Sequence, residues 1–168
     1  MLSIKEVLAK PFARIIHKRI QKWANKPIET QEKLFQDLIS IAASTTFGKD
    51  HDFISINAYS DFIKRVPIRD YEALKPYVEK VVKGQENVLW PGKPIYFAKT
   101  SGTTSGSKYI PITKESMPYH IEAARNAILL YIHETGNSKF VDGKMIFLQG
   151  SPILDVKNGI QLGRLSGI

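Results

Sequence analysis

The sequence predicts an α/β fold in which an N-terminal helical layer packs on a partial mixed sheet, and the sheet carries a strand–loop–strand phosphate loop. Three observations predict this fold. Apolar residues recur at the period of an α-helix through most of residues 1–87. Short runs of β-type composition follow within residues 88–168, and a polar segment at 100–108 separates two of them.

The first expected helix covers residues 3–24. Its apolar residues fall on one stripe with a period of 3.6, and they are Ile4, Val7, Leu8, Phe12, Ile15, Ile16, Ile20 and Trp23. Pro11 lies inside this pattern and predicts a kink or a break into two shorter helices. A second helix is expected to begin at Thr30, which would be its N-cap, and to end before Gly48.

Three further helices are expected along the chain. Two short ones fall near residues 57–65 and 70–83, and Asp70 is the expected cap of the second. The clearest helical pattern covers residues 114–134 and ends at Gly136, since glycine adopts the left-handed conformation that closes many helices.

Four segments have the composition of strands. Ile95–Ala98 and Tyr109–Ile112 flank the polar loop, and Pro111 places the second of them at a sheet edge because proline cannot donate to a ladder. Met145–Leu148 is expected to be a buried strand, and residues 160–168 predict one more.

Composition and charge exclude several classes of protein. The chain is 43% hydrophobic and has no cysteine, so it has the composition of a folded domain without disulfides or thiolate metal sites. It has no apolar run of about 18 residues and no secretory signal, and we expect a cytoplasmic protein.

Residues 1–26 carry seven basic residues against Glu6 alone, a net charge of +6 out of the chain's +8. The last residues, 163–168, contain neither a cap nor a polar tail, and we expect an N-terminal piece of a longer protein.

The polar segment between the two expected strands carries the candidate chemistry. It combines hydroxyl side chains, two glycines and a terminal lysine in the order Thr100, Ser101, Gly102, Thr103, Thr104, Ser105, Gly106, Ser107 and Lys108. Glycines let backbone N–H groups turn inward around an anion, and hydroxyls add small donors. The lysine adds a compact positive charge. These groups suit a triphosphate or pyrophosphate, although a flexible hairpin connection has a similar composition.

The order of residues separates this loop from the common nucleotide-binding motifs. A Walker loop has Gly-Lys-Ser/Thr and opens into a helix, whereas Lys108 lies between Ser107 and Tyr109 and a strand follows. The dinucleotide fingerprint fails for the same reason. The sequence therefore predicts a phosphate clamp between two strands.

The loop and its surroundings resemble the Gretchen Hagen family of auxin-responsive acyl-acid amido synthetases and their bacterial relatives, within the adenylate-forming superfamily. Most of that superfamily has Gly directly after Thr-Thr and Pro before Lys, where this chain has Ser105 and Ser107. The other segments that carry the resemblance are Phe47-Gly48-Lys49-Asp50-His51, Val66-Pro67-Ile68-Arg69-Asp70-Tyr71, Trp90-Pro91-Gly92-Lys93-Pro94 and Lys99-Thr100-Ser101-Gly102-Thr103-Thr104-Ser105-Gly106.

The resemblance implies an ATP- and Mg-dependent ligase. In such an enzyme a carboxylic acid attacks the α-phosphate of ATP, pyrophosphate leaves, and an amine such as an amino acid captures the acyl-adenylate. It implies that residues 100–108 bind the β- and γ-phosphates and that Lys108 offsets the charge of the departing pyrophosphate. Family members are about three times as long, so this segment alone is expected to be inactive. A ligase that forms a CoA thioester stays an alternative.

Several other features have weaker functional interpretations. No histidine pair has metal-ligand spacing, and no metal site is expected. Arg125 could reach a substrate carboxylate, but a solvated or salt-bridged helix arginine is favoured. The basic first helix could contact anionic lipid in a non-enzymatic anion- or membrane-binding module, whereas docking on its own domain is favoured. Nucleic-acid binding is not expected, because aromatic residues do not alternate with the basic ones.

Overall fold

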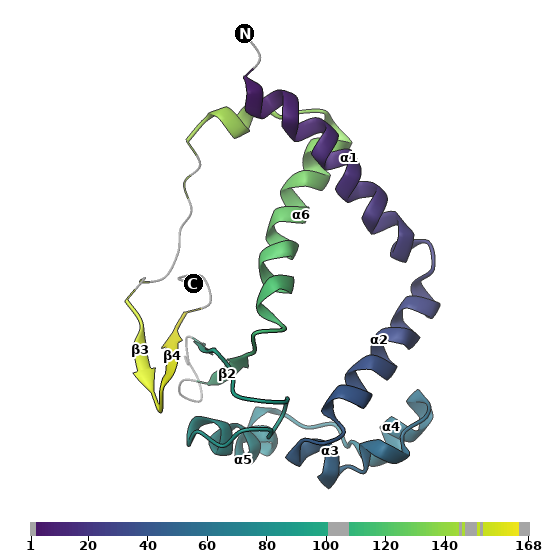
Figure 1. Cartoon of the computed structure of the whole chain (residues 1–168), viewed down its shortest axis with the longest axis vertical. Helices are drawn as coiled ribbons and strands as arrows, with labels where there is room; N and C mark the ends of the chain where they lie inside the picture. Colours follow the sequence, from purple (N-terminus) through teal and green to yellow (C-terminus); the bar gives the residue numbers. More distant parts are fainter. Residues whose placement is uncertain (1–2, 101–107, 145, 147–150, 152, 165–168) are drawn as a thin grey trace. The chain divides into compact units, whose positions relative to one another are not determined.

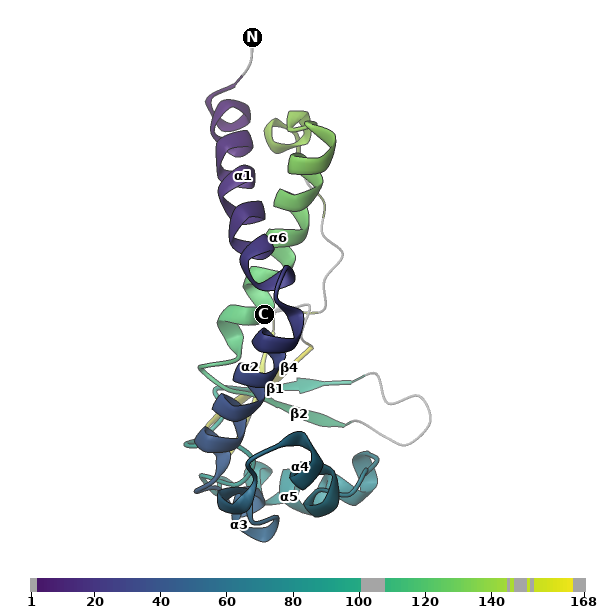
Figure 2. The same ribbon diagram turned by 90° about the vertical axis from the view of Figure 1, so that its right-hand side faces the viewer.

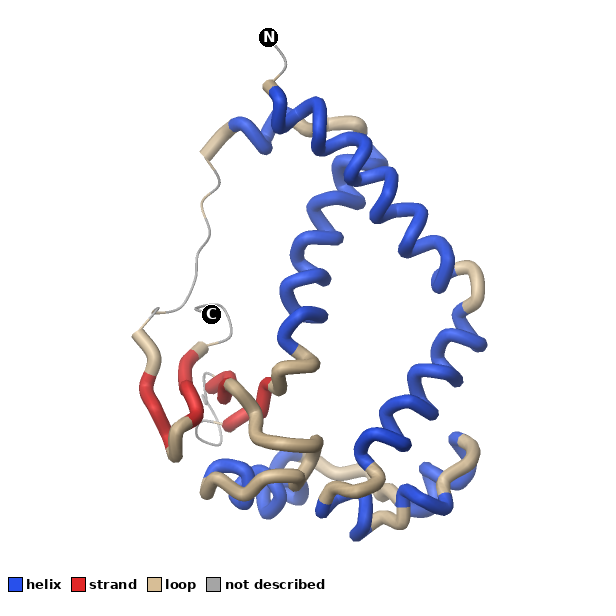
Figure 3. The backbone as a smooth tube through the Cα atoms, in the orientation of Figure 1, coloured by secondary structure: helices blue, strands red, loops and turns tan. Residues whose placement is uncertain are grey.

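The computed structural model describes residues 3–100, 108–144, 146, 151 and 153–164 (Figure 1). The chain divides into two compact units. Unit 1 comprises Met1–Thr30 and Glu115–Leu148, and unit 2 comprises Gln31–Lys114 and Gln149–Ile168. Figure 3 distinguishes the helices from the strands. None of the helices in the described part of the chain is both long and apolar enough to cross a bilayer.

Unit 1 is built on the helices α1 (Ile4–Ala24) and α6 (Met117–Thr135), which pack against each other. A capping box begins α1, because the Ser3 hydroxyl accepts from the Glu6 N–H and the Glu6 carboxylate accepts from the Ser3 N–H. The helix continues through Pro11, so of the two alternatives, a kink or a break, the break into two shorter helices is wrong. Pro11 lies on the solvent side, where water can hydrate the carbonyl that loses its partner.

The face of α1 that packs on α6 differs from the expected stripe. Ala13 and Ile16 are buried with Leu129 and Ile132 of α6. By contrast, most of the expected stripe is exposed, namely Ile4, Val7, Leu8, Phe12, Ile15 and Trp23. The distance between two packed helices depends on the side chains at their contact, and small residues permit a close approach. The contact therefore uses the alanine side of the helix.

The end of α6 follows the expectation from the sequence. Gly136 has φ +67°, and its N–H donates to the Ile132 carbonyl. A 3₁₀ turn, η2 (Lys139–Asp142), then returns to α1, where Phe140 adds to the apolar cluster of unit 1. The predicted helical stop is thus confirmed.

The helices α2 (Pro27–Ala42), α3 (Thr46–Asp50), α4 (Tyr59–Arg65) and α5 (Tyr71–Val82), with a 3₁₀ turn η1 (Phe53–Ser55), lead into the sheet. The expected start of α2 at Thr30 is wrong, because the helix begins at Pro27, where proline's fixed φ suits the first helical position. Asp70 caps α5 as expected, since its carboxylate accepts from the Ala73 N–H at 2.9 Å.

The end of α2 and the start of α3 approach each other closely. The Thr45 hydroxyl donates to the Ala42 carbonyl at 2.7 Å and accepts from the Gly48 N–H at 3.0 Å. A Cβ atom at position 48 would lie 2.1 Å from the Ala42 carbonyl oxygen. Only glycine fits this position. The apolar cluster below it includes Ile39, Ala42, Phe53 and Ile56, with Trp90 packed against it.

The sheet is mixed and has the strand order β2-β1-β4-β3, formed by β1 (Tyr96–Lys99), β2 (Tyr109–Ile112), β3 (Asp155–Lys157) and β4 (Ile160–Gly163). The strands β1 and β4 are parallel, and the two outer pairs are antiparallel. This arrangement confirms the predicted α/β class and the predicted edge position of β2. The helix that covers the sheet is α5, because Val81 is buried with Phe97, Ile160 and Leu162.

Near the C-terminal end of the chain the structure differs from the sequence prediction in two places. The strand β3 was not expected, and Asn158 and Gly159, both with positive φ, join it to β4 in a tight hairpin. Within the expected buried strand Met145–Leu148, the structure describes Ile146, which is exposed and lies in no strand, so the expectation is wrong for this residue. The other residues of that segment, and residues 165–168, lie outside the described residues.

Candidate phosphate-loop site

The hairpin of β1 and β2 holds the two ends of the predicted phosphate loop together (Figure 2). The Thr100 N–H donates to the Lys108 carbonyl at 3.1 Å, and the Lys108 N–H donates to the Thr100 hydroxyl at 3.2 Å. The loop is thus closed at its base by two hydrogen bonds between its first and last residues. Residues 101–107, which include the candidates Ser101 to Ser107, lie outside the described residues.

Tyr71, the first residue of α5, supports the lysine end of the loop. Its hydroxyl accepts from the Tyr109 N–H at 2.9 Å, and the Lys108 Nζ lies 5.2 Å from the centre of its ring. A cation at this distance from an aromatic ring is stabilised by the ring quadrupole. The phenol therefore fixes the strand beside Lys108 and also contacts its charge. Tyr71 belongs to a segment that carries the family resemblance, but the sequence did not indicate its role.

The outer side of β2 has no N–H group left for another strand within residues 109–111. The Tyr109 N–H points outward to Tyr71, and residue 111, which faces the same way because strands alternate with a period of two, is proline. The hairpin therefore ends the sheet on this side.

A pocket of about 170 Å³ lies between α5 and the strands beside the hairpin. Its charged lining consists of Glu72, Lys75, Glu79 and Lys157, two acids and two bases. The Lys157 ammonium also lies 4.9 Å from the centre of the Tyr109 ring. Because its formal charges cancel, this pocket does not by itself favour an anion.

Backbone hydrogen bonds in unit 2 bring together the start of α3 and the turn that contains Trp90-Pro91-Gly92, both parts of segments that carry the resemblance. The N–H groups of Thr46 and Phe47 donate to the carbonyls of Asn87 and Val88 at 2.8 and 2.9 Å. The turn that follows is closed by Asn87, whose side-chain oxygen accepts from the Gly92 N–H at 2.7 Å. These hydrogen bonds thus join the start of α3 to the segment that leads into β1.

The Asp50-His51-Asp52 segment has a structural role. His51 is buried, and its Nδ1 lies 2.7 Å from the Phe47 carbonyl. The Tyr77 hydroxyl of α5 donates to the Asp50 carboxylate at 2.9 Å. Burial, and then this hydrogen bond, raise the pKa of Tyr77 above its ordinary value. The segment ties α3 to α5 through these contacts.

Three further residues weighed from the sequence, one arginine and two histidines, have clear positions. Arg125 forms an ion pair with Glu122 one turn earlier on α6 at 3.0 Å, which confirms the favoured interpretation. His17 and His133, far apart in sequence, are stacked with their ring centres 3.9 Å apart. Sequence spacing gave no signal for this pair, because α1 and α6 bring it together.

Comparison with known proteins identifies the class to which this fold and hairpin belong. The N-terminal domain of the GH3 family matches residues 16–168. The probable indole-3-acetic acid-amido synthetase GH3.13 of Oryza sativa subsp. japonica is 36% identical over 84 residues, which are 49% of this chain and 17% of that protein. The indole-3-acetic acid-amido synthetase GH3.15 of Arabidopsis thaliana is 30% identical over 117 residues, or 66% of this chain and 19% of that protein.

A solved structure supports the same fold. The GH3.15 acyl acid amido synthetase superposes with a TM-score of 0.71 at 20% identity, over 81% of this chain and 25% of that one. The chain belongs to the GH3 family, whose curated members matched here are amido synthetases and related acid–amino acid ligases. It spans about a fifth of the length of the curated relatives reported above.

Proposed function

We propose that this chain forms the N-terminal part of an ATP-dependent, adenylate-forming acyl-acid amido synthetase. The observation that carries the proposal is the β1–β2 hairpin, closed at Thr100 and Lys108, in a chain of the GH3 family. The relatives reported above are plant enzymes, and the bacterial-type assignment stays a prediction. So does a cytoplasmic location.

The proposed chemistry requires little from the protein beyond position and charge. A substrate carboxylate attacks the α-phosphate of ATP, and an amine then captures the acyl-adenylate. The nucleophile comes from the substrate, so the hairpin has to orient the phosphates and stabilise the departing pyrophosphate. Lys108 suits this role because its backbone is held by Thr100 and its ammonium group lies over Tyr71.

Magnesium is proposed to accompany ATP, since Mg²⁺ is usually held through substrate phosphates and one or two carboxylates. The described ends of the loop supply donors and a positive charge, which suit the phosphates rather than the metal. Residues that would hold the metal are therefore not assigned.

Pyrophosphate exchange by the full-length protein tests the proposal. Lys108→Ala is expected to lower the rate of ATP–pyrophosphate exchange by about 10²–10³, the usual effect of removing one charge-stabilising donor. Affinity for AMP or an acyl-adenylate analogue should fall much less, because the lost charge faces pyrophosphate. Lys83→Ala, at the exposed C-terminal end of α5, removes the same charge away from the hairpin and should leave the rate unchanged.

Equal losses of rate and AMP affinity in Lys108→Ala would contradict the assigned role. Absence of exchange in the full-length wild type with any carboxylic acid would contradict the proposed adenylation itself. Residues 1–168 alone should show no exchange. Identification of the acceptor distinguishes an amide-forming enzyme from the CoA-thioester alternative.

The membrane-binding alternative has one observation in its favour. The strongly basic α1 leaves bulky apolar side chains exposed, including Ile4, Leu8 and Phe12. Sedimentation with anionic and with neutral vesicles tests this alternative. Binding that requires anionic lipid and is lost in Leu8→Ser would support membrane contact by α1.

A further inference from the structure

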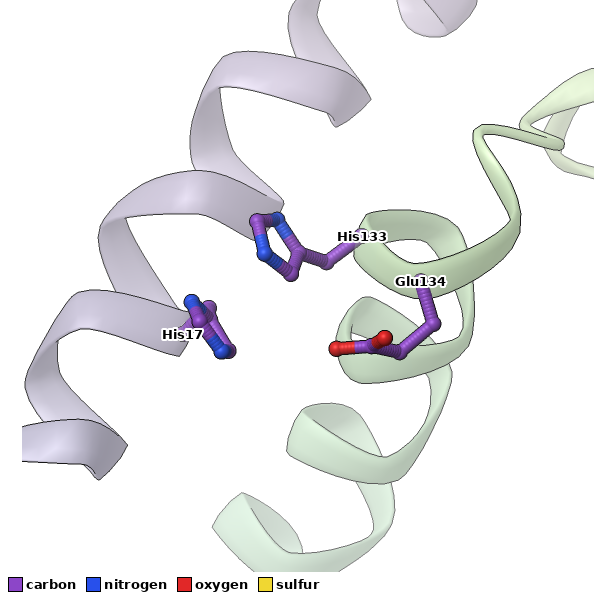
Figure 4. Close-up of side chains that lie close together, drawn as sticks. All are labelled: His17, His133 and Glu134. Atoms are coloured by element: carbon purple, nitrogen blue, oxygen red, sulfur yellow. The ribbon is translucent and has the colours of Figure 1, made fainter.

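The contact between α1 and α6 contains a cluster of three side chains that can bind a metal ion. His17 lies on α1, and His133 and Glu134 are consecutive residues of α6. One ligand atom from each lies within 4.8 Å of the other two. Figure 4 shows the three side chains gathered between the two helices. Both histidines are half-buried and the glutamate is exposed, so an ion can reach the cluster from solvent.

We propose that His17, His133 and Glu134 form a binding site for a zinc-type divalent ion that ties α1 to α6. Two imidazoles, one carboxylate and a remaining position for water are a donor set that zinc uses in proteins. Imidazole nitrogen favours Zn²⁺, Ni²⁺ and Cu²⁺ over Mg²⁺ and Ca²⁺, which prefer oxygen ligands. The proposal is independent of the proposed ATP chemistry.

The spacing of the ligand atoms is close to that of a bound site, and the two stacked rings have to turn so that their lone pairs meet at one ion. Two ligand atoms on one tetrahedral zinc ion lie about 3.4 Å apart, since each bond is about 2.1 Å long. The limit of 4.8 Å within the cluster therefore leaves up to about 1.4 Å to close, a distance on the scale of a change in side-chain rotamer.

Gln21 can support the proposed metal site through a hydrogen bond to one of its ligands, His17. Its amide nitrogen lies 3.2 Å from the Nε2 of His17, one turn along α1. A histidine that binds a metal through one ring nitrogen carries a proton on the other, and a neutral amide oxygen can accept a hydrogen bond from that N–H group. The Gln21 amide offers such an oxygen after rotation about its last bond. This contact would orient the His17 ring toward its partners.

The alternative is that the two rings simply stack as part of the helix contact. Phenylalanine keeps a planar ring for stacking and removes the metal-binding nitrogens. The double variant His17→Phe/His133→Phe therefore separates the two interpretations. A second variant, Glu134→Gln, changes an exposed side chain and does not disturb the packing. His120→Ala removes an exposed histidine elsewhere on α6 and serves as the matched control.

The experiment uses the 168-residue chain after removal of metals with a chelator. Zn²⁺ is titrated in competition with a chromophoric chelator, and thermal unfolding is followed with and without Zn²⁺. One equivalent should bind, and a zinc concentration of 100 times the dissociation constant should raise the melting temperature by about 5–10 °C. Mg²⁺ at the same concentration should have no effect. Affinity should fall at least about tenfold in Glu134→Gln and in the double variant, with an unchanged circular dichroism spectrum, and should be unchanged in His120→Ala.

The proposal is overturned if the wild type does not bind Zn²⁺, or if the folded double variant binds it as tightly as the wild type. It is also overturned if His120→Ala weakens binding as much as Glu134→Gln does. Should the double variant fail to fold, Glu134→Gln decides: unchanged zinc affinity in that variant rejects the site.

Discussion

Substitution of Gly48 by alanine tests the close approach of α2 and α3. The added Cβ would lie 2.1 Å from the Ala42 carbonyl oxygen, whereas carbon and oxygen normally approach to about 3.3 Å. The backbone must therefore move by about 1.2 Å. Overpacking of this kind costs about 1–3 kcal/mol. The movement also breaks the two hydrogen bonds of the Thr45 hydroxyl, at about 1 kcal/mol each, so a loss of about 3–5 kcal/mol is expected.

Denaturant unfolding followed by tryptophan fluorescence measures this loss. Trp90 packs against the cluster that contains Ala42, so it reports on the affected part of unit 2. The measurement is made in a Trp23→Phe background, which removes the exposed second tryptophan and leaves Trp90 alone. Lys49→Ala, at the next, exposed position of α3, is the matched control and should change stability by less than about 0.5 kcal/mol.

The sign of the stability change in Gly48→Ala shows whether α2 and α3 approach each other closely at this position. Without a clash, replacing glycine by alanine inside a helix stabilises it by up to about 1 kcal/mol, because alanine loses less conformational entropy. A Gly48→Ala variant as stable as the wild type, or more stable, would refute the close approach.

Three further predictions follow from unit 2. Asn158→Ala should cost about 2 kcal/mol and speed amide exchange in β3 and β4, because it removes a 2.6 Å bond to the Val82 carbonyl and strains a residue at φ +50°. Tyr71→Phe should speed exchange of the Tyr109 amide while keeping the ring below the lysine; an unchanged rate would exclude the bond. The pKa of Tyr77 is raised in the folded protein, so this residue makes its full contribution to stability below about pH 10. That contribution is lost as the pH rises through the pKa of the folded state. The stability difference between wild type and Tyr77→Phe should therefore shrink above pH 10, and a constant difference would contradict this.

Local chemistry explains why parts of the fold were predictable from the sequence. Proline at position 111 restricts its strand to an edge, and Gly136 and Asp70 act within a few residues of the helix ends that they close. The strand β3 was missed although Asn158-Gly159 is a strong hairpin signal.

Other features depend on contacts between distant residues. Periodicity showed that α1 is amphipathic, but the alanine side contacts α6, which no local pattern reveals. Tyr71 and Lys108 are brought together by packing of α5 on the hairpin. The stacking of His17 on His133 likewise depends on the pairing of two helices. At the candidate site, the sequence predicted the two strands and the loop between them, while the roles of the loop residues stay predictions.

The closed outer side of β2 sets the direction in which this sheet can grow. An incoming strand would find carbonyl groups but, within residues 109–111, no available N–H, so a regular ladder could not form there. A further strand would therefore find regular pairing partners at the β3 edge rather than at the β2 edge. The short β3 carries Asp155 and Lys157, charges that discourage pairing between separate molecules. The two edges of the sheet therefore differ. The edge formed by β2 is closed to a further strand, and the edge formed by β3 is the side at which the sheet can be extended.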